Sequence, residues 1–381
     1  MRRVIEPNPR SLKKGKAQQK KIDDPQSITA PKDAILSEPH SIPNTWTSLT
    51  NHIRARSFMV KVVSLALFTS MFVALWIHPD AMPLFNDGGK SIDEGAISLK
   101  SAKNFVPSKS MSIDHNLNHV KTDVIILDSY PHDAKAFTQG LLVVQQNHDK
   151  YFIESTGLYG ESTLRKVDIT TGKVLTQTAL PSNLFGEGIT LSRNQLLLLT
   201  WKSGNGFTYE LSAQKKDGRN GIISESFSRL KKFAIKTQTG EGWGIDGNGT
   251  HLILSDGSSR LYVLSPDTLK QIGTVEVTLN GQRLKYLNEL EVVGRYIYAN
   301  VWYENSIVKI DSGSGKVVAV YECSNVIQKV EELAQKEGID FNTNDGAVLN
   351  GIAYDGDSDV FYITGKLWPF VFGVRLVDSY V

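Results

Sequence analysis

Short apolar runs separated by turns recur along the chain from about residue 124 to the C-terminus. Each unit has an opening motif, a strand such as YFIESTG, another such as TLRKVDI, a turn such as TTGKV and a further strand. Five copies are visible, and their openings read FTQGLL at 137, FGEGIT at 185, EGWGID at 241, LNELEV at 287 and LNGIAY at 349. The chain therefore carries a fivefold internal repeat.

Two alignments relate the five repeats. Aligning the openings makes one residue of each equivalent, at spacings of 48, 56, 46 and 62 residues: Gln139, Glu187, Trp243, Glu289 and Gly351. The strand directly after each opening, which is the second strand of the unit, aligns as well, from FIESTG at 152 to FYITGK at 361. Repeats of this length built from short strands predict a β-propeller, whose blades are four-stranded sheets around a central channel. We expect an all-β, five-bladed β-propeller over residues 121–381.

One segment of the repeat region has helical periodicity instead. In NVIQKVEELAQKEG, residues 325–338, the apolar side chains of Val326, Val330, Leu333 and Ala334 fall at helical spacing. This segment predicts a helical insertion in the last repeat.

A strongly apolar run lies upstream of the repeats. Residues 58–77, FMVKVVSLALFTSMFVALWI, contain one charged side chain, Lys61. A helix over the uncharged part would be about 24 Å long, and Lys61 can extend its ammonium group to the interface. The alternative is a cleaved signal peptide, but the 57 preceding residues exceed a short basic n-region, and no small-residue cleavage site follows. We expect a single transmembrane helix that acts as a signal anchor.

The segments that flank this run differ in composition. Residues 1–57 are rich in Lys, Pro, Ser and Gln without hydrophobic periodicity, which predicts a disordered basic tail. Residues 78–120 are polar with scattered Gly, Ser and Asn, as in a stem. Basic residues precede the run and acidic residues follow it, so the positive-inside rule places the tail in the cytosol. We expect a single-pass type II membrane protein of the ER or Golgi, with its propeller in the lumen.

Charge and cysteine content limit the function. Residues 1–57 hold eleven Lys or Arg against five Asp or Glu, and the remainder holds 31 against 35. A mildly acidic folded part argues against a nucleic-acid partner, which would require basic residues to neutralise phosphates. The single cysteine, Cys323, excludes an internal disulfide and a thiolate-rich metal site. Asn248 begins an Asn-Gly-Thr sequon, which is consistent with a lumenal glycoprotein.

Candidate chemistry gathers at one end of the predicted channel. The innermost strands of a propeller line the channel, so residues that open them converge on one mouth, and the turn after the second strand approaches the same end. The residues expected there are Gln139, Glu187, Trp243, Glu289, Trp201, Trp302 and Lys366. A carboxylate in an apolar mouth costs free energy unless it is paired or protonated, and a raised pKa would suit it to proton transfer. Glu187 is therefore the first candidate for a catalytic group.

Structural roles for these residues stay open at this point. The tryptophans could fill gaps between blades, Lys366 could be a solvated turn residue, and Asn288 could cap a strand. We expect His132, which follows Pro131 in a predicted loop, to be exposed to solvent. No Ser/His/Asp set, phosphate-binding loop or metal-spaced histidines can be assembled.

Nine motifs, in order, closely resemble those of the plant-type glutaminyl-peptide cyclotransferases. They are YPHDAKAFTQGL, ESTGLYGESTLRKVD, LFGEGITL, LTWK, GEGWGID, LNELE, ANVW, LNGIAYD and TGKLWP, and they span about residues 130 to 370. The resemblance implies a five-bladed propeller enzyme that closes the N-terminal Gln of peptides into pyroglutamate and releases ammonia. It implies no cofactor, and the sequence offers no coordination pattern for a structural cation on the axis. We expect a monomer.

The resemblance also implies roles for individual residues. Glu187, in the FGEG motif, would be the central acid/base. The substrate-binding positions would be Phe137, Gln139, Phe185, Trp201, Trp243, Asn288, Trp302 and Lys366. Either Asn288 or Lys366 could stabilise the oxyanion. Insertions at 215–232 and 325–348 depart from the family pattern and leave peptide preference open.

Two other functions compete with this one. A non-catalytic propeller could capture peptide N-termini, because propeller mouths bind as readily as they catalyse. An ester or lactone hydrolase on a related propeller would hold a metal by several axial carboxylates and amides.

Overall fold

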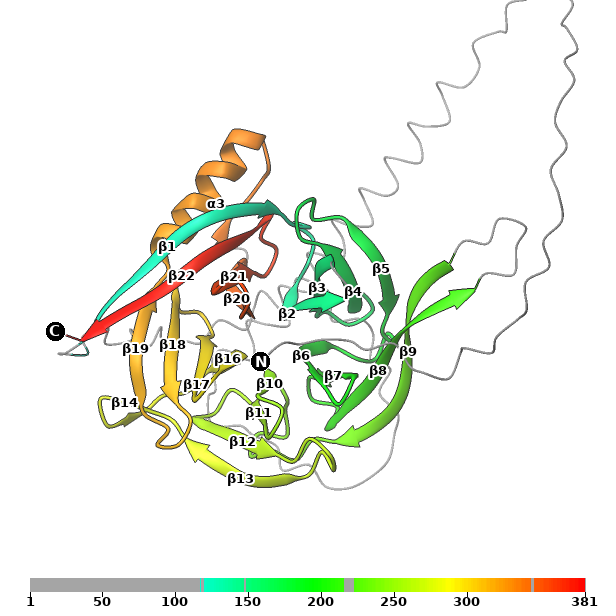
Figure 1. The fold of residues 1–381 in the computed structure, drawn as a ribbon, viewed down its shortest axis with the longest axis horizontal. Helices are drawn as coiled ribbons and strands as arrows, with labels where there is room; N and C mark the ends of the chain where they lie inside the picture. The colour runs from blue at the N-terminus through cyan, green and yellow to red at the C-terminus, as the bar shows by residue number, and fades with distance from the viewer. Residues whose placement is uncertain (1–116, 118–119, 147–148, 216–222, 344–345, 381) are drawn as a thin grey trace, which may run out of the picture. The chain divides into compact units, whose positions relative to one another are not determined.

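The computed structural model describes residues 117, 120–146, 149–215, 223–343 and 346–380. In this part of the chain, five antiparallel four-stranded sheets form a ring around a central axis (Figure 1). The prediction of an all-β, five-bladed β-propeller is confirmed. The tail, the apolar run and nearly all of the stem lie outside the described residues. Among the described residues, no helix has the length and apolar character needed to cross a membrane.

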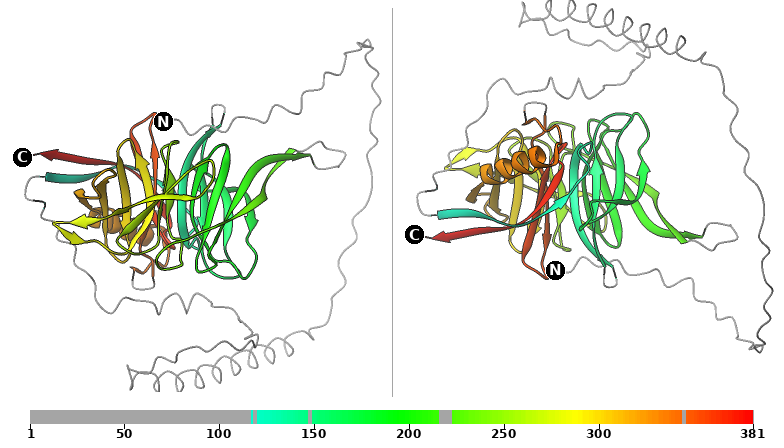
Figure 2. Two further views of the ribbon diagram at one scale, coloured as in Figure 1. Left: turned by 90° about the horizontal axis from the view of Figure 1, so that it is seen from below. Right: turned by 90° about the horizontal axis from the view of Figure 1, so that it is seen from above.

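Each blade runs from an inner strand to an outer strand. The first contains β2 (Thr138–Gln146), β3 (Asp149–Thr156), β4 (Thr163–Asp168) and β5 (Val174–Ala179). The second contains β6 (Gly186–Ser192), β7 (Gln195–Thr200), β8 (Asn205–Lys215) and β9 (Ile223–Ala234). The third contains β10 (Ile245–Gly247), β11 (Leu252–Ser255), β12 (Arg260–Leu264) and β13 (Gln271–Glu276). The β8–β9 hairpin extends beyond the ring (Figure 2).

The remaining blades complete the ring. The fourth contains β16 (Leu287–Val293), β17 (Tyr296–Val301), β18 (Ser306–Asp311) and β19 (Val317–Glu322), and the short hairpin of β14 (Thr278–Leu279) and β15 (Gln282–Arg283) precedes it. The fifth contains β20 (Leu349–Asp355), β21 (Val360–Gly365), β22 (Phe370–Tyr380) and, as its outer strand, β1 (Val120–Pro131). The first and last described strands therefore close the propeller. Their pairing runs from Val120 opposite Tyr380 to Pro131 opposite Phe370.

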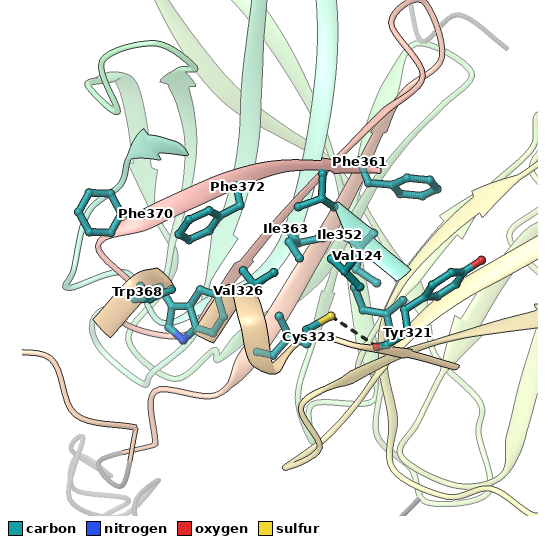
Figure 3. Close-up of a cluster of buried hydrophobic side chains, with 14 of the residues drawn as sticks. Val124, Tyr321, Cys323, Val326, Ile352, Phe361, Ile363, Trp368, Phe370 and Phe372 are labelled. Carbon is teal, nitrogen blue, oxygen red and sulfur yellow. Dashed lines mark hydrogen bonds between the residues drawn. The ribbon is translucent and has the colours of Figure 1, made fainter. Parts of the chain in front are cut away.

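The core lies between the blades. Each sheet packs against a neighbour on both faces, so its second strand is buried on both sides and reads as a continuous apolar run, as in QLLLLT of β7. At the closure, Val124 of β1 packs with Phe361, Ile363 and Phe372 of the fifth blade (Figure 3). These contacts bury the joint between the two ends of the repeat region.

The predicted helical insertion is present as α3 (Ser324–Glu337), between β19 and β20. Its buried residues Val326, Val330 and Ala334 belong to the same cluster as Trp368 and Phe372 (Figure 3). The helix ends at Gly338, whose left-handed conformation (φ 69°) lets its N–H bond to the carbonyl of Gln335 at 3.2 Å. Through its buried residues the helix covers the outside of the fifth blade.

Candidate active site

A repeated turn brings one residue per blade to the same end of the propeller. The residues directly after the second strands are Gly157, Trp201, Asp256, Trp302 and Lys366. Each is followed by a residue in the left-handed region, namely Leu158 (φ 85°), Lys202 (53°), Gly257 (76°), Tyr303 (65°) and Leu367 (61°). Non-glycine residues with this conformation are uncommon and are concentrated at functional sites.

Backbone hydrogen bonds join these turns to the openings of the inner strands. The N–H groups of Trp201 and Trp302 donate to the carbonyls of Phe185 and Tyr286 at 3.0 and 2.8 Å, and that of Lys366 donates to Val348 at 2.9 Å. The turns that carry Trp201, Trp302 and Lys366 therefore lie against the openings of the inner strands.

The strand register corrects the alignment of the openings in the fourth and fifth repeats. The residue before the key position pairs with the end of the second strand, as in Gly186 with Thr200, Leu287 with Val301 and Leu349 with Gly365. The equivalents of Gln139 and Glu187 are therefore Asn288 and Asn350, one residue before Glu289 and Gly351. The inner strands of the first, second, fourth and fifth blades share a register shift at this point. The displacement comes from the openings themselves, because FTQG and FGEG begin two residues before the key position and the two Leu-Asn openings begin one residue before it.

Glu289 consequently has a different place from the one predicted. Its side chain is buried, and its two oxygens accept the N–H groups of Leu141 at 3.5 Å and Ile352 at 2.8 Å. It therefore connects the inner strand of the fourth blade to those of the first and fifth. Burial, and then the nearby charge of Glu291, raise the pKa of Glu289. This carboxyl group holds the inner strands together and does not belong to the mouth.

Glu187 lies at the floor of the mouth with 5% of its surface exposed. Its Oε1 accepts a hydrogen bond from Nε2 of Gln139 at 3.2 Å. Burial raises the pKa of this carboxyl group well above its ordinary value, the charge of Lys366 opposes that rise, and the charge of Glu241 adds to it. The surroundings of Glu187 thus favour its protonated form more than water would.

Lys366 is also buried, with 4% exposure, and its Nζ lies 4.7 Å from the centre of the Phe137 ring. Burial lowers the pKa of Lys366 to about 8, and Glu187 acts in the opposite direction. Lys366 is therefore a buried side chain whose protonated form is less favoured than in water. It is not the solvated turn residue that the sequence left as an alternative.

Aromatic side chains form one wall of the mouth. Phe185 makes edge contacts with Phe137, Trp201 and Tyr159 at centroid distances of 6.1, 5.4 and 5.5 Å. Phe185 fills the space beside Gly157, where a Cβ atom would lie 2.3 Å from its ring. Gly157 of the first blade therefore cannot be replaced by a residue with a side chain while Phe185 of the second blade occupies this space.

The opposite wall is made by Trp243 and Trp302, whose rings meet edge to face at 5.3 Å. Glu241 links the two walls, because one of its oxygens, Oε2, accepts the indole N–H groups of both Trp201 and Trp243 at 2.8 Å. The indoles are thereby fixed in direction. Sequence analysis did not single out Glu241, although it lies in the GEGWGID motif.

Two asparagines on the ring carry unpaired oxygens. Oδ1 of Asn288 and Oδ1 of Asn350 are buried and have no hydrogen-bond partner among the described residues. Such atoms cost free energy unless a ligand or water donates to them. Asn288 was predicted and Asn350 was not. The signal was present, because the fourth and fifth openings both begin with Leu-Asn.

His132 contradicts the expectation of solvent exposure. Its side chain is 2% exposed, Nε2 contacts Oε1 of Glu154 at 3.0 Å, and Nδ1 contacts the carbonyl of Trp368 at 2.7 Å. Glu154 also pairs with Arg165 at 2.8 Å. The local sequence did not reveal these partners because they come from β3, β4 and the turn before β22. Among the residues that the structure describes, no three His, Cys, Asp or Glu side chains are grouped to hold a metal ion.

All nine predicted site residues lie at this end of the propeller. The protein is therefore a five-bladed propeller that holds a buried carboxyl group, a buried lysine and a group of tryptophan side chains at one end. The family model described as Glutamine cyclotransferase matches residues 98–376. This chain belongs to the glutamine cyclotransferase family.

Individual relatives agree with that assignment. The chain is 36% identical over 270 residues to a protein named glutaminyl-peptide cyclotransferase from Arabidopsis thaliana, which covers 71% of this chain and 75% of the relative. It is also similar to the crystal structure of Myxococcus xanthus glutaminyl cyclase, with a TM-score of 0.56 and 34% identity over 69% of this chain and 99% of that one.

Proposed function

We propose that this protein is a glutaminyl-peptide cyclotransferase in which Glu187 is the general acid and base. The observation that carries this proposal is the buried Glu187 carboxyl group, with its raised pKa, hydrogen-bonded to Gln139 at the floor of an aromatic mouth. The names of the related plant and bacterial proteins support the reaction assigned here.

The reaction requires a proton to move from one nitrogen to another. The neutral α-amine of an N-terminal Gln attacks its own side-chain carbonyl carbon, a C–N bond forms, and the amide nitrogen leaves as ammonia. Glu187 gives its proton to the leaving nitrogen, and the resulting carboxylate takes the proton that the attacking nitrogen loses. Proton transfer of this kind contributes about 10² to 10⁴ in rate.

The rest of the mouth orients the substrate. The tryptophan walls are half-buried at the rim, where they can enclose the aliphatic part of a curled Gln side chain. The unpaired oxygen of Asn288 suits an N–H group of the substrate amine or amide. Lys366 is placed beside Glu187 to stabilise the oxygen that becomes negative when the carbonyl is attacked.

We expect the purified full-length protein to convert peptides with an N-terminal Gln into pyroglutamyl peptides. Peptides whose α-amine is acetylated should be unchanged, because the nucleophile is blocked. Mass spectrometry for the loss of ammonia is the measurement. Binding of Gln peptides without mass loss, by a protein shown to be folded, would instead support a binding module.

The membrane topology forms a second part of the proposal. Residues 58–77 would anchor the chain with the propeller in the lumen, in line with the basic residues before the run and the acidic residues after it. Asn248 lies in the turn between β10 and β11, where an oligosaccharide could be attached. The membrane topology does not affect the chemistry proposed for the mouth.

Protease treatment of sealed microsomes should therefore remove only about the first 57 residues. A glycosidase should reduce the mass of the protected fragment, and Asn248→Gln should abolish that shift. Digestion of the propeller in intact vesicles would contradict the orientation.

A further inference from the structure

A row of side-chain amides leads to Glu187 from the inner strand of the fifth blade. Asn350 of β20 is 1% exposed, and its Nδ2 donates to the backbone carbonyl of Thr138 at 3.0 Å and approaches Oε1 of Gln139 at 3.4 Å. Nε2 of Gln139 then donates to Oε1 of Glu187 at 3.2 Å. Three members of the ring around the mouth are therefore joined in series.

The chemistry of these groups permits one set of orientations. The carbonyl of Thr138 can only accept a hydrogen bond, so the Asn350 atom that faces it has to be the amide nitrogen. That nitrogen also faces Gln139, which therefore presents its oxygen to Asn350. The NH₂ group of Gln139 is left to face Glu187. A fixed backbone group thus determines the direction of two side-chain amides.

This direction distinguishes the two oxygens of Glu187. Oε1 accepts from the Gln139 NH₂ group, and in a neutral carboxyl group the carbonyl oxygen is a better acceptor than the hydroxyl oxygen, so this bond favours Oε1 as the carbonyl oxygen. A neutral carboxyl group has one O–H, which is accordingly placed on Oε2. In this orientation Oδ1 of Asn350 is buried without a hydrogen-bond partner among the described residues. Such an atom costs stability, so a role in stability alone does not explain Asn350.

We propose that Asn350 is a positioning residue that, by orienting Gln139, makes Oε2 of Glu187 the oxygen that exchanges protons with the substrate. The inference rests on the proposed cyclotransferase reaction. Asn350 acts through Gln139, so its effect should depend on Gln139 being present.

Loss of the Asn350 amide would free Gln139 to turn. Its oxygen could then face Glu187 and accept an O–H from Oε1, which would hold the proton on the unproductive oxygen. Since that bond favours the protonated form, the limb of the pH–rate profile that reports Glu187 should move to higher pH.

The test compares Asn350→Ala, Gln139→Ala and the double variant in the full-length protein, with a short Gln peptide as substrate. Asn350→Ala is expected to lower kcat about tenfold and change KM less than about threefold, as for loss of an oriented hydrogen bond to an ionisable group. In the Gln139→Ala background it should lower kcat less than about twofold, because the group through which it acts is gone.

Thr364→Val is the matched control. Thr364 lies in the same blade, is fully buried, and donates one hydrogen bond to the carbonyl of Phe370 at 2.9 Å. It should lower the melting temperature without a change in the pH–rate profile. Equal profiles for Asn350→Ala and Thr364→Val, or equal effects of Asn350→Ala in both backgrounds, would overturn the inference. A folded wild-type protein without cyclising activity would overturn the proposed function instead.

Discussion

Glu187→Gln is expected to lower kcat by about 10²-fold or more while the protein remains folded. The amide has the size of the carboxyl group, and its oxygen can still accept the hydrogen bond from Gln139. It cannot give a proton to the leaving nitrogen or take one from the attacking amine. Substrate affinity should change much less, because the tryptophan walls and the buried asparagines remain. Steady-state kinetics with a Gln peptide, beside a thermal melt, measure both quantities.

Glu289→Gln provides the comparison for this variant. Glu289 is equally buried and also has a raised pKa, but its oxygens accept two backbone N–H groups and do not face the mouth. An amide keeps one acceptor and presents NH₂ to the other N–H, so the variant should lower the melting temperature and leave kcat within a few-fold of wild type. Turnover by Glu187→Gln equal to that of the wild type would refute the proposed mechanism, even with cyclisation established.

The sequence predicted the propeller because the information for it is local. Each blade repeats an inner strand and a buried second strand such as β7, and Asp-containing turns precede the outer strands of the first, third and fourth blades. In the turn from 168 to 173, Oδ1 of Asp168 accepts from the N–H and hydroxyl of Thr171, and Gly172 has φ 66°. The closure by β1 is not local, since the partner of Val120 is Tyr380. Nothing in the pattern near β1 indicates which sheet it joins.

The sequence indicated where the candidate site lies but misplaced one of its residues. Glu187 stands out in the sequence as a charged residue between two glycines at the opening of an inner strand, and Lys366 as a charged residue in the turn after a second strand. Glu289 was wrongly given the same place because the Leu-Asn opening begins one residue later in the strand than FTQG and FGEG do, and the position belongs to Asn288. Asn350 and Glu241 act through the direction of their hydrogen bonds to Gln139 and to two indoles. The directions of these hydrogen bonds depend on contacts between blades, and such contacts cannot be inferred from the repeat pattern of the sequence.

The buried ionic network behind the mouth gives the second large expected effect. Glu154 accepts hydrogen bonds from Thr138 at 2.7 Å, from His132 at 3.0 Å and from Arg165 at 2.8 Å. Both ring nitrogens of His132 face oxygens that can only accept, those of Glu154 and the Trp368 carbonyl, so the imidazole must carry both protons. Burial alone would lower the pKa of His132, but the Glu154 carboxylate raises it above its ordinary value.

Glu154→Gln should destabilise the propeller by about 3 to 5 kcal/mol, because it leaves His132 buried without a counter-charge and leaves Arg165 with only the partly exposed Asp133. For a domain of this size that corresponds to a fall in melting temperature of about 10 °C. Asp133→Asn is the matched control. Asp133 pairs with the same arginine at 2.9 Å, but its side chain is 37% exposed, so the loss should be within about 1 kcal/mol. Equal melting temperatures for the two variants would contradict the assigned role of Glu154.

The pH dependence of this difference follows from the direction of each pKa shift. The pKa of Glu154 is lowered in the folded protein: burial opposes that shift, and the charges of His132 and Arg165 outweigh burial. Its contribution is therefore present above the ordinary pKa of a glutamate and is lost as pH falls through the lowered value. The contribution of His132 is complete below its ordinary pKa of about 6.5 and is lost as pH rises through the raised value.

The gap in melting temperature between wild type and Glu154→Gln should accordingly be widest near pH 5 to 6, between those two limits, and should narrow as His132 loses its proton. A gap that stays constant from pH 6 to pH 9 would show that His132 is not charged in the folded protein. The coupling would then be between Glu154 and Arg165 alone, and the joint between β1 and the first blade would not depend on the imidazole.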